Sequence, residues 1–155
     1  RMQKPTRRST SLVIATYNRG EKILETIKTA LAQSIDFEEI LVVDDCSSDD
    51  TAQLIGAAYP DVRVVRTPEN LFTSGARNFG ARAAKGEWLM FLDHDDLLLP
   101  EAHEVLSELL DAFPVARAAF ADHTYENRVT GEYYENHHSA QAPFHRLRQI
   151  HPLAS

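Results

Sequence analysis

The first two thirds of the chain alternate short apolar runs with longer segments of helical spacing. Each run is rich in Val, Ile, Leu or Ala and most of them close on polar residues, which is typical of a buried β-strand. We therefore predict strands at residues 12–16, 39–44, 62–66, 87–92 and 116–121.

The intervening segments carry apolar residues at the spacing of one helix face. Asp49 and Asp50 place negative charge where the helix dipole favours it, at the start of a helix. Gly86 is a typical helix end and Pro100 a typical helix start. These patterns predict helices at residues 21–33, from residue 49 onward, at 75–85 and at 100–113.

Strands that alternate with helices predict an α/β fold with a mostly parallel sheet and helices on both faces. We expect residues 11–121 to form this core, after a basic tail at residues 1–10. Residues 122–155 have a different, polar and aromatic pattern. It predicts a hairpin around a turn at residues 129–132 and a short helix at residues 144–150.

Polar residues gather where the predicted strands end. Tyr17 follows the first strand, Asp44 and Asp45 end the second, and residues 93–96 (Asp-His-Asp-Asp) follow the fourth. In open α/β sheets, ligands bind at the carboxyl ends of the strands. The pattern therefore predicts a ligand site at this edge of the sheet.

The acidic residues have two interpretations. Carboxylates this close repel one another unless a cation or hydrogen-bond donors offset the charge, and their oxygens suit Mg²⁺ or Mn²⁺. A metal bridging to a diphosphate would also make it a better leaving group. The alternative is that Asp95 or Asp96, and likewise Asp44 or Asp45, caps a following helix. Two acidic pairs at the ends of different strands favour a common ligand.

Charge and composition exclude several classes of protein. The net charge of −7 argues against binding to a nucleic-acid backbone. The single cysteine excludes an internal disulfide and fits a reducing compartment. No apolar run approaches the roughly 18–20 residues that cross a bilayer, and the basic tail lacks the apolar stretch of a signal peptide. We expect a cytoplasmic location, with peripheral association at the inner membrane face as the alternative.

Other site motifs are weak or missing. The histidines of the last segment match no standard zinc-ligand spacing; they are His137, His138, His145 and His151. His94 lies between two aspartates and is a candidate to touch a metal or an acceptor. The sequence has no Gly-x-Gly-x-x-Gly, which argues against a dinucleotide-binding Rossmann domain.

Four blocks of the sequence resemble the family-2 glycosyltransferases in order and spacing. They are VIATYNR at 13–19, ILVVDDCSSDDT at 40–51, Asn70 with GARNFG at 75–80, and AKGEWLMFLDHDD at 84–96. The resemblance covers residues 11–113 and implies the GT-A fold, the Rossmann-like sheet of nucleotide-diphospho-sugar transferases. It also implies that the chain stops before the end of the catalytic domain.

The resemblance implies a role for several positions. Tyr17 and Asp45 match the residues that hold the base of a nucleotide sugar, by stacking and by a hydrogen bond. Asp93 matches the residue near the ribose, and Asp95 the ligand of the metal on the diphosphate. Further donor-binding positions lie in the same blocks; they are Ala15, Gly75 and Arg77.

Two of these positions, Tyr17 and Arg77, also have a structural interpretation, and Cys46 departs from the family pattern. For Tyr17 the alternative to stacking is plain packing, and for Arg77 it is a structural tie between helix and loop. Cys46 departs from the family, which has glycine or a small residue there, and is expected to affect the turn after Asp45 without removing a ligand.

The resemblance implies transfer of a sugar from a nucleotide diphosphate, most commonly uridine diphosphate, to an acceptor hydroxyl with inversion. The acceptor class is a glycan, a lipid-linked sugar or another hydroxyl compound. The family's acidic general base is absent from its expected context after residue 121. The alternative function is therefore a module that binds the nucleotide sugar without turnover.

Overall fold

The computed structural model of this 155-residue chain describes residues 9–119, 121, 123–127, 132–136 and 149–152. The chain divides into two compact units. The first comprises Arg1–Leu24 and Phe37–His94, and the second comprises Glu25–Asp36 and Asp95–Ser155. Each unit is described by itself below.

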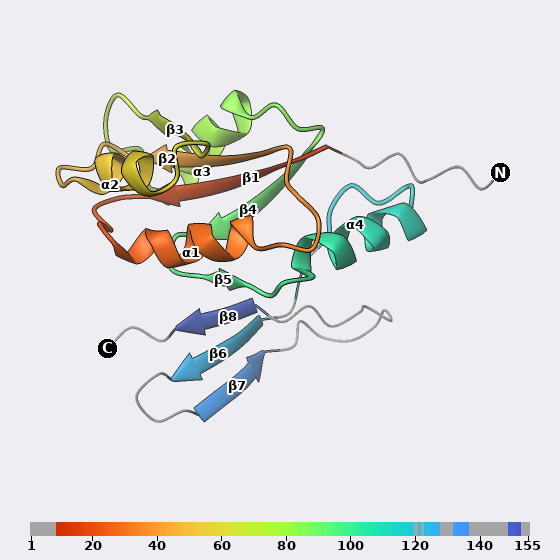
Figure 1. The fold of residues 1–155 in the computed structure, drawn as a ribbon. Coiled ribbons are helices and arrows are strands. Elements are labelled where there is room, and N and C mark those ends of the chain that lie inside the picture. Colours follow the sequence, from red (N-terminus) through yellow and green to blue (C-terminus); the bar gives the residue numbers. More distant parts are fainter. Residues whose placement is uncertain (1–8, 120, 122, 128–131, 137–148, 153–155) are drawn as a thin grey trace. The chain divides into compact units, whose positions relative to one another are not determined.

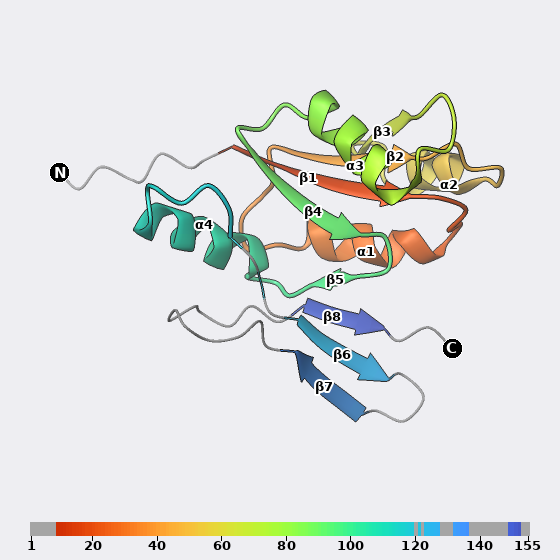
Figure 2. The same cartoon turned by 180° about the vertical axis from the view of Figure 1, so that it is seen from behind.

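The first unit is built on a parallel sheet with the strand order β3-β2-β1-β4, visible in Figures 1 and 2. Its strands are β1 (Thr10–Thr16), β2 (Glu39–Asp44), β3 (Arg63–Arg66) and β4 (Trp88–Asp93). Central β1 pairs in parallel with both β2 and β4. The register places Ala15 beside Val43 on one side and beside Asp93 on the other, so the ends of three strands meet at one edge.

Helix α3 (Phe72–Ala83) covers one face of this sheet (Figure 2). Its residue Ala76 packs in a buried cluster with Val13, Leu41 and Val43. A Cβ added to Gly80 would lie 2.5 Å from Val13 Cγ1 and 2.8 Å from Val43 Cγ2. Glycine at position 80 therefore allows the helix to approach the sheet closely.

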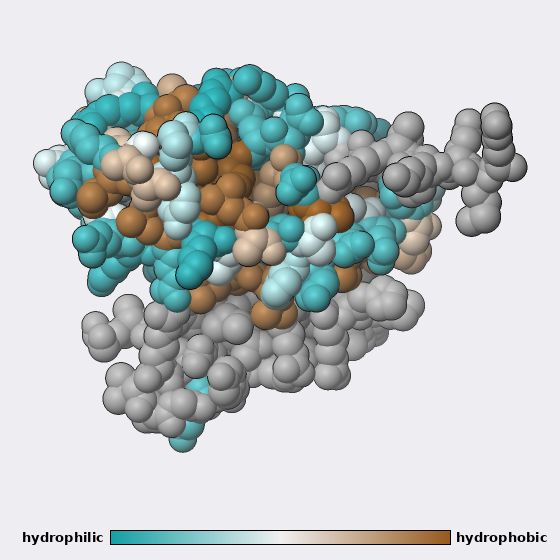
Figure 3. All heavy atoms as spheres, in the orientation of Figure 1, coloured by the Kyte–Doolittle hydropathy of each residue, from teal (hydrophilic) through white to brown (hydrophobic). Residues whose placement is uncertain are grey.

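The opposite face is covered by α2 (Thr51–Ala58), which follows β2, and by the start of α1 (Lys22–Leu31) (Figure 1). Ile55 of α2 and Ile23 of α1 are fully buried. In the view of Figure 3, hydrophobic residues gather in the middle of the described surface, with hydrophilic residues mostly around them. The sheet is thus sandwiched between helices, as an α/β fold requires.

The second unit contains a separate sheet with the order β5-β8-β6-β7. Its strands are β5 (Leu97–Leu98), β6 (His123–Asn127), β7 (Glu132–Asn136) and β8 (Gln149–Pro152), and its helix is α4 (Ala102–Ala112). Gln33, which follows α1, donates to Leu99 O at 2.8 Å and accepts from His103 N at 3.0 Å. One amide side chain therefore joins three segments of this unit.

Most predicted elements are confirmed within a few residues. The parallel sheet contains the first four predicted strands, and all four predicted helices form. The β6–β7 hairpin is antiparallel, with Tyr125 opposite Tyr134, while most of its predicted turn lies outside the described residues. Helix α3 begins at Phe72, so Gly75, the predicted first residue, lies inside its first turn.

Two predictions are wrong. Residues 116–119 and 121 form no strand. This segment is mostly alanine, which has low strand propensity and little apolar surface to bury. The predicted helix at 144–150 fails at its end, where Gln149 and Ile150 pair with β5 as strand β8. Its residues 144–148 lie outside the described part.

Candidate functional site

The carboxyl edge of the first sheet carries the predicted site residues of the first unit. Tyr17 follows β1 and is 44% exposed, Asp45 follows β2, and Asp93 is the last residue of β4. The Asp45 N–H donates to Thr16 O at 2.8 Å, which joins the ends of β1 and β2. The parallel register therefore brings together residues that are far apart in the sequence.

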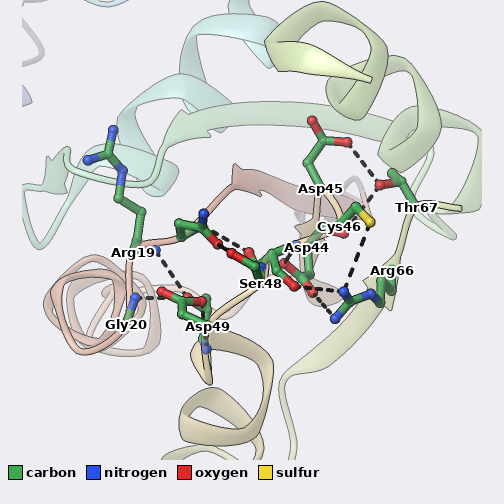
Figure 4. Close-up of polar contacts among 12 residues, drawn as sticks. Arg19, Gly20, Asp44, Asp45, Cys46, Ser48, Asp49, Arg66 and Thr67 are labelled. Carbon is green, nitrogen blue, oxygen red and sulfur yellow. Dashed lines mark hydrogen bonds and ion pairs between the residues drawn. The ribbon is translucent and has the colours of Figure 1, made fainter. Parts of the chain in front are cut away.

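Asp44 and Asp45 are neighbours with different tasks, as Figure 4 shows. The fully buried Asp44 forms an ion pair with Arg66 at 3.1 Å and accepts from Ser47 N at 3.1 Å. Both of its oxygens are thus used inside the protein. Helix α2 begins only at Thr51, so the prediction that Asp44 or Asp45 caps it is wrong.

Asp45 points away from Asp44, toward Thr67 (Figure 4). Its Oδ1 accepts from Thr67 Oγ1 at 2.9 Å and from Leu71 N at 2.8 Å, and the residue is only 3% exposed. Within the described part of the chain, no residue donates to its other oxygen. A buried, firmly positioned carboxylate therefore keeps acceptor capacity for an N–H group.

Cys46 makes the turn after Asp45 in the left-handed backbone region, with φ of 62°. This region costs a residue with a Cβ atom roughly 1–2 kcal/mol. The Cys46 N–H donates to Asp44 O at 2.8 Å, so the turn forms despite the side chain. Cysteine at this position strains the turn and leaves Asp45 in place.

Hydrogen bonds tie the loop after β1 to the loop after β2. Asn18 N donates to Ser47 Oγ at 2.9 Å, and Asn18 Oδ1 accepts from Ser48 N at 2.8 Å. Gly20 N donates to Thr51 Oγ1 at 2.8 Å. The two loops around Tyr17 are therefore fixed to each other, a role that the sequence interpretation missed because it treated residues 47–51 only as a helix start.

The Thr51 hydroxyl also donates to Asp49 Oδ1 at 2.5 Å. This hydrogen bond lowers the pKa of the exposed Asp49 carboxyl below its ordinary value. Asp49 further accepts from Thr51 N at 3.1 Å, so it serves the first turn of α2. Asp49 is a structural acid rather than a ligand-facing one.

Arg77 of α3 forms an ion pair with Asp93 at the end of β4. The structural alternative for Arg77, a tie between a helix and a strand end, is therefore present. Both side chains remain partly exposed, at 38% and 46%. Asp93 is positioned by Arg77 and still reachable from solvent.

Gly75 supports Asp45 indirectly. A Cβ added to Gly75 would lie 2.7 Å from Leu71 Cβ. Glycine here leaves room for Leu71, whose N–H binds Asp45. Ala15 has a backbone role as well, because its carbonyl oxygen lies 3.2 Å from His94 Nδ1.

Asp95 and Asp96 belong to the second unit. Asp95 is exposed in a turn and Asp96 is buried. The next element is strand β5, and α4 begins at Ala102 after Glu101. The alternative that Asp95 or Asp96 caps a following helix is therefore wrong.

A model of glycosyl transferase family 2 matches residues 11–153. The chain belongs to this family. Among its relatives is the succinoglycan biosynthesis protein ExoO of Rhizobium meliloti, 42% identical over 104 residues, 66% of this chain and 30% of that protein. Another is the Escherichia coli UDP-Glc:alpha-D-GlcNAc-diphosphoundecaprenol beta-1,3-glucosyltransferase WfaP, 39% identical over 88 residues, 56% of this chain and 35% of that protein.

Solved structures of S. aureus TarS share the fold of this glycosyl transferase family 2 chain. Complexes of TarS 1–349 with UDP and with UDP-GlcNAc align with a TM-score of 0.62 and 25% identity. They cover 77% of this chain and 36% and 34% of the TarS chains. The expected GT-A fold is confirmed. The chain spans about a third of the length of the two relatives named above.

No group of three or more His, Cys, Asp or Glu residues in the described part of this family-2 chain is arranged to hold a metal ion. His137, His138 and His145, weighed above as zinc ligands, lie outside the described residues. Among the described helices, none combines the length and apolar character needed to cross a membrane.

Proposed function

We propose that the chain binds a nucleoside-diphosphate sugar at the carboxyl edge of the first sheet, for metal-dependent, inverting transfer of the sugar to an acceptor hydroxyl. The observation that carries the proposal is Asp45, a buried carboxylate with one oxygen fixed by Thr67 and Leu71 and acceptor capacity left on the other. Membership of glycosyl transferase family 2 supports the reaction class.

In this proposal each residue of the first unit handles a different part of the donor. Asp45 accepts a hydrogen bond from an N–H of the base, and the exposed ring of Tyr17 stacks on the base. Asp93 accepts from the ribose hydroxyls, and the ion pair with Arg77 holds its carboxylate in position. Arg77 acts through Asp93 and is a positioning residue.

The donor is proposed to be a uridine-diphosphate sugar. TarS, which shares the fold, has been solved with UDP and with UDP-GlcNAc, and the name of WfaP states UDP-glucose as its donor. A base with an N–H that can donate to Asp45 fits the acceptor left on that carboxylate.

Asp95 is proposed to hold Mn²⁺ or Mg²⁺. Asp95 is exposed in a turn, and the helix α4 that follows begins after Glu101. These ions commonly take one or two protein carboxylates and complete their shell with phosphate oxygens and water, so a single aspartate fits. When bound, such an ion offsets the charge that develops on the leaving diphosphate.

The acceptor is proposed to be a growing glycan or a lipid-linked sugar. ExoO is named for succinoglycan biosynthesis, and the acceptor in the name of WfaP is a diphosphoundecaprenol-linked sugar. A lipid-linked acceptor would bring the enzyme to a membrane surface. The residue that deprotonates the acceptor hydroxyl is not among those assigned above.

The second candidate function is a module that binds the nucleotide sugar without turnover. Release of UDP from a UDP-sugar in the presence of an acceptor distinguishes the two. The enzyme releases UDP with metal present, whereas the module binds the donor and leaves it intact.

Calorimetric titration with UDP, with and without Mn²⁺, tests the donor site. Binding should require the metal and disappear in Asp95→Ala. Asp50→Ala is the matched control, since Asp50 is exposed and its side chain makes no cap hydrogen bond. If no nucleoside diphosphate binds the unaltered chain with the metal present, the proposal is wrong for this chain.

A further inference from the structure

Phe72 is a bulky residue in an unfavourable backbone conformation at the carboxyl edge. Its φ is 57°, in the left-handed region that disfavours residues with a Cβ atom, and its side chain is 77% exposed. Packing of a buried ring usually compensates such strain. This ring gains little from packing, so the stability of the fold does not account for phenylalanine at position 72.

The turn that carries Phe72 is fixed by side-chain acceptors. Leu71 N donates to Asp45 Oδ1 at 2.8 Å, and Phe72 N donates to Asn70 Oδ1 at 2.9 Å. Gly75 leaves the space that Leu71 occupies. The exposed ring therefore extends from a backbone that is held in place.

Two exposed aromatic residues each directly follow a residue that hydrogen-bonds Asp45. Asp45 N donates to Thr16 O, and Tyr17 is the next residue after Thr16. Leu71 N donates to Asp45 Oδ1, and Phe72 is the next residue after Leu71. Tyr17 thus follows a residue that binds the backbone N–H of Asp45, and Phe72 follows a residue that binds its carboxylate.

We infer that Phe72 is a second aromatic contact for the base of the donor nucleotide, acting together with Tyr17. The inference rests on the proposed function, in which Asp45 receives the base. Every base has a π-face, so stacking is tolerant of base identity. Phe72 therefore raises the affinity for the nucleoside part of the donor without selecting among bases.

Titration with UDP and Mn²⁺ tests this in Phe72→Gly and Phe72→Tyr. The loss of one stacking contact should raise the Kd of Phe72→Gly about 5- to 150-fold. Phe72→Tyr keeps a ring and should stay within about threefold of the unaltered chain. Glycine adopts positive φ without strain, so the Tm of Phe72→Gly should be equal or higher. A purely structural role for Phe72 would lower stability and affinity together.

Two more variants serve as controls. Phe72→Asn separates the loss of the ring from the added backbone flexibility of glycine, and Phe113→Ala removes an exposed ring elsewhere. Asn tolerates the left-handed region better than most residues and has no ring, so Phe72→Asn should lose affinity as Phe72→Gly does. Phe113→Ala removes another exposed phenylalanine, 51% exposed, from the second unit and should leave the Kd unchanged.

Unchanged UDP affinity in both Phe72→Gly and Phe72→Asn would overturn the inference, as would an equal loss in Phe72→Tyr. Both results require that the unaltered chain binds UDP. If it binds no nucleoside diphosphate, the proposed function fails first, and the inference fails with it.

Discussion

Glu39 begins strand β2 and Asp45 directly follows it, and the two carboxylates differ in how many hydrogen bonds they accept. At the amino end, Glu39 accepts from Ser11 Oγ at 2.8 Å and from Lys85 N, and pairs with Arg63 at 3.1 Å. At the carboxyl end, Asp45 uses one oxygen and keeps the other available. A carboxylate whose oxygens all accept hydrogen bonds within the protein stabilises the fold. A carboxylate with one oxygen left available is suited to a ligand.

The two ends also use glycine for different purposes. A Cβ on Gly86 would lie 2.5 Å from Ser11 N, so glycine there closes the network around Glu39. Gly75 leaves room for Leu71, which orients Asp45. If this comparison is right, substitutions at the amino end change stability alone, and those at the carboxyl end change binding more than stability.

Asp45→Asn should have the largest effect on binding. The amide keeps an oxygen for Thr67 and Leu71 but replaces the open acceptor with an NH₂ donor. Loss of a charge-assisted hydrogen bond should raise the Kd for UDP about 10- to 100-fold, with a small change in Tm. Calorimetry and thermal unfolding measure the two quantities. An unchanged Kd would remove Asp45 from the site.

Gly86→Ala and Gly75→Ala form a matched pair. At position 86 the new methyl meets backbone, so the free energy of unfolding should fall by about 1–3 kcal/mol while the Kd for UDP is unchanged. At position 75 the methyl displaces Leu71 and should weaken UDP binding. Chemical denaturation and titration of both variants check this. Equal effects of the pair on binding would contradict the comparison.

Glu39→Gln should destabilise the first unit by about 1–2 kcal/mol, because Arg63 loses its carboxylate partner. Nucleotide affinity should not change. The comparison is weakened if UDP binding falls together with stability.

The same substitution should alter acid sensitivity. Burial acts to raise the pKa of Glu39, but the Lys85 N–H, the Ser11 hydroxyl and Arg63 together hold it below the ordinary value. A depressed folded-state pKa adds stability above the pKa of a glutamate in the unfolded chain, about 4.3, and that stability disappears as the pH falls through the lower folded value. Denaturation at stepwise lower pH should therefore show a smaller acid-induced loss in Glu39→Gln. An identical pH dependence in both proteins would contradict this.

The sequence predicted the first unit well because its strands and helices follow strong periodicities and its polar residues gather at strand ends. The strand-end pattern alone did not separate Asp45 from Asp44, since two adjacent aspartates look alike until the fold places them on opposite sides; the family resemblance singled out Asp45. The strain at Phe72 and the Glu39 network depend on contacts between distant segments. The second unit was harder to predict from the sequence, because strands such as β5 are short and its polar segments have little periodicity.

Cys46→Gly should produce the smallest effect. It tests whether a residue next to Asp45 can change stability without changing UDP binding. Glycine relieves the strain of a φ of 62°, and its greater freedom in the unfolded chain offsets part of the gain. The free energy of unfolding should rise by about 0.5–1 kcal/mol. Because the turn already forms with cysteine and leaves Asp45 in place, the Kd for UDP should not change. Tighter UDP binding in this variant would instead show that the strained turn holds Asp45 away from its best position.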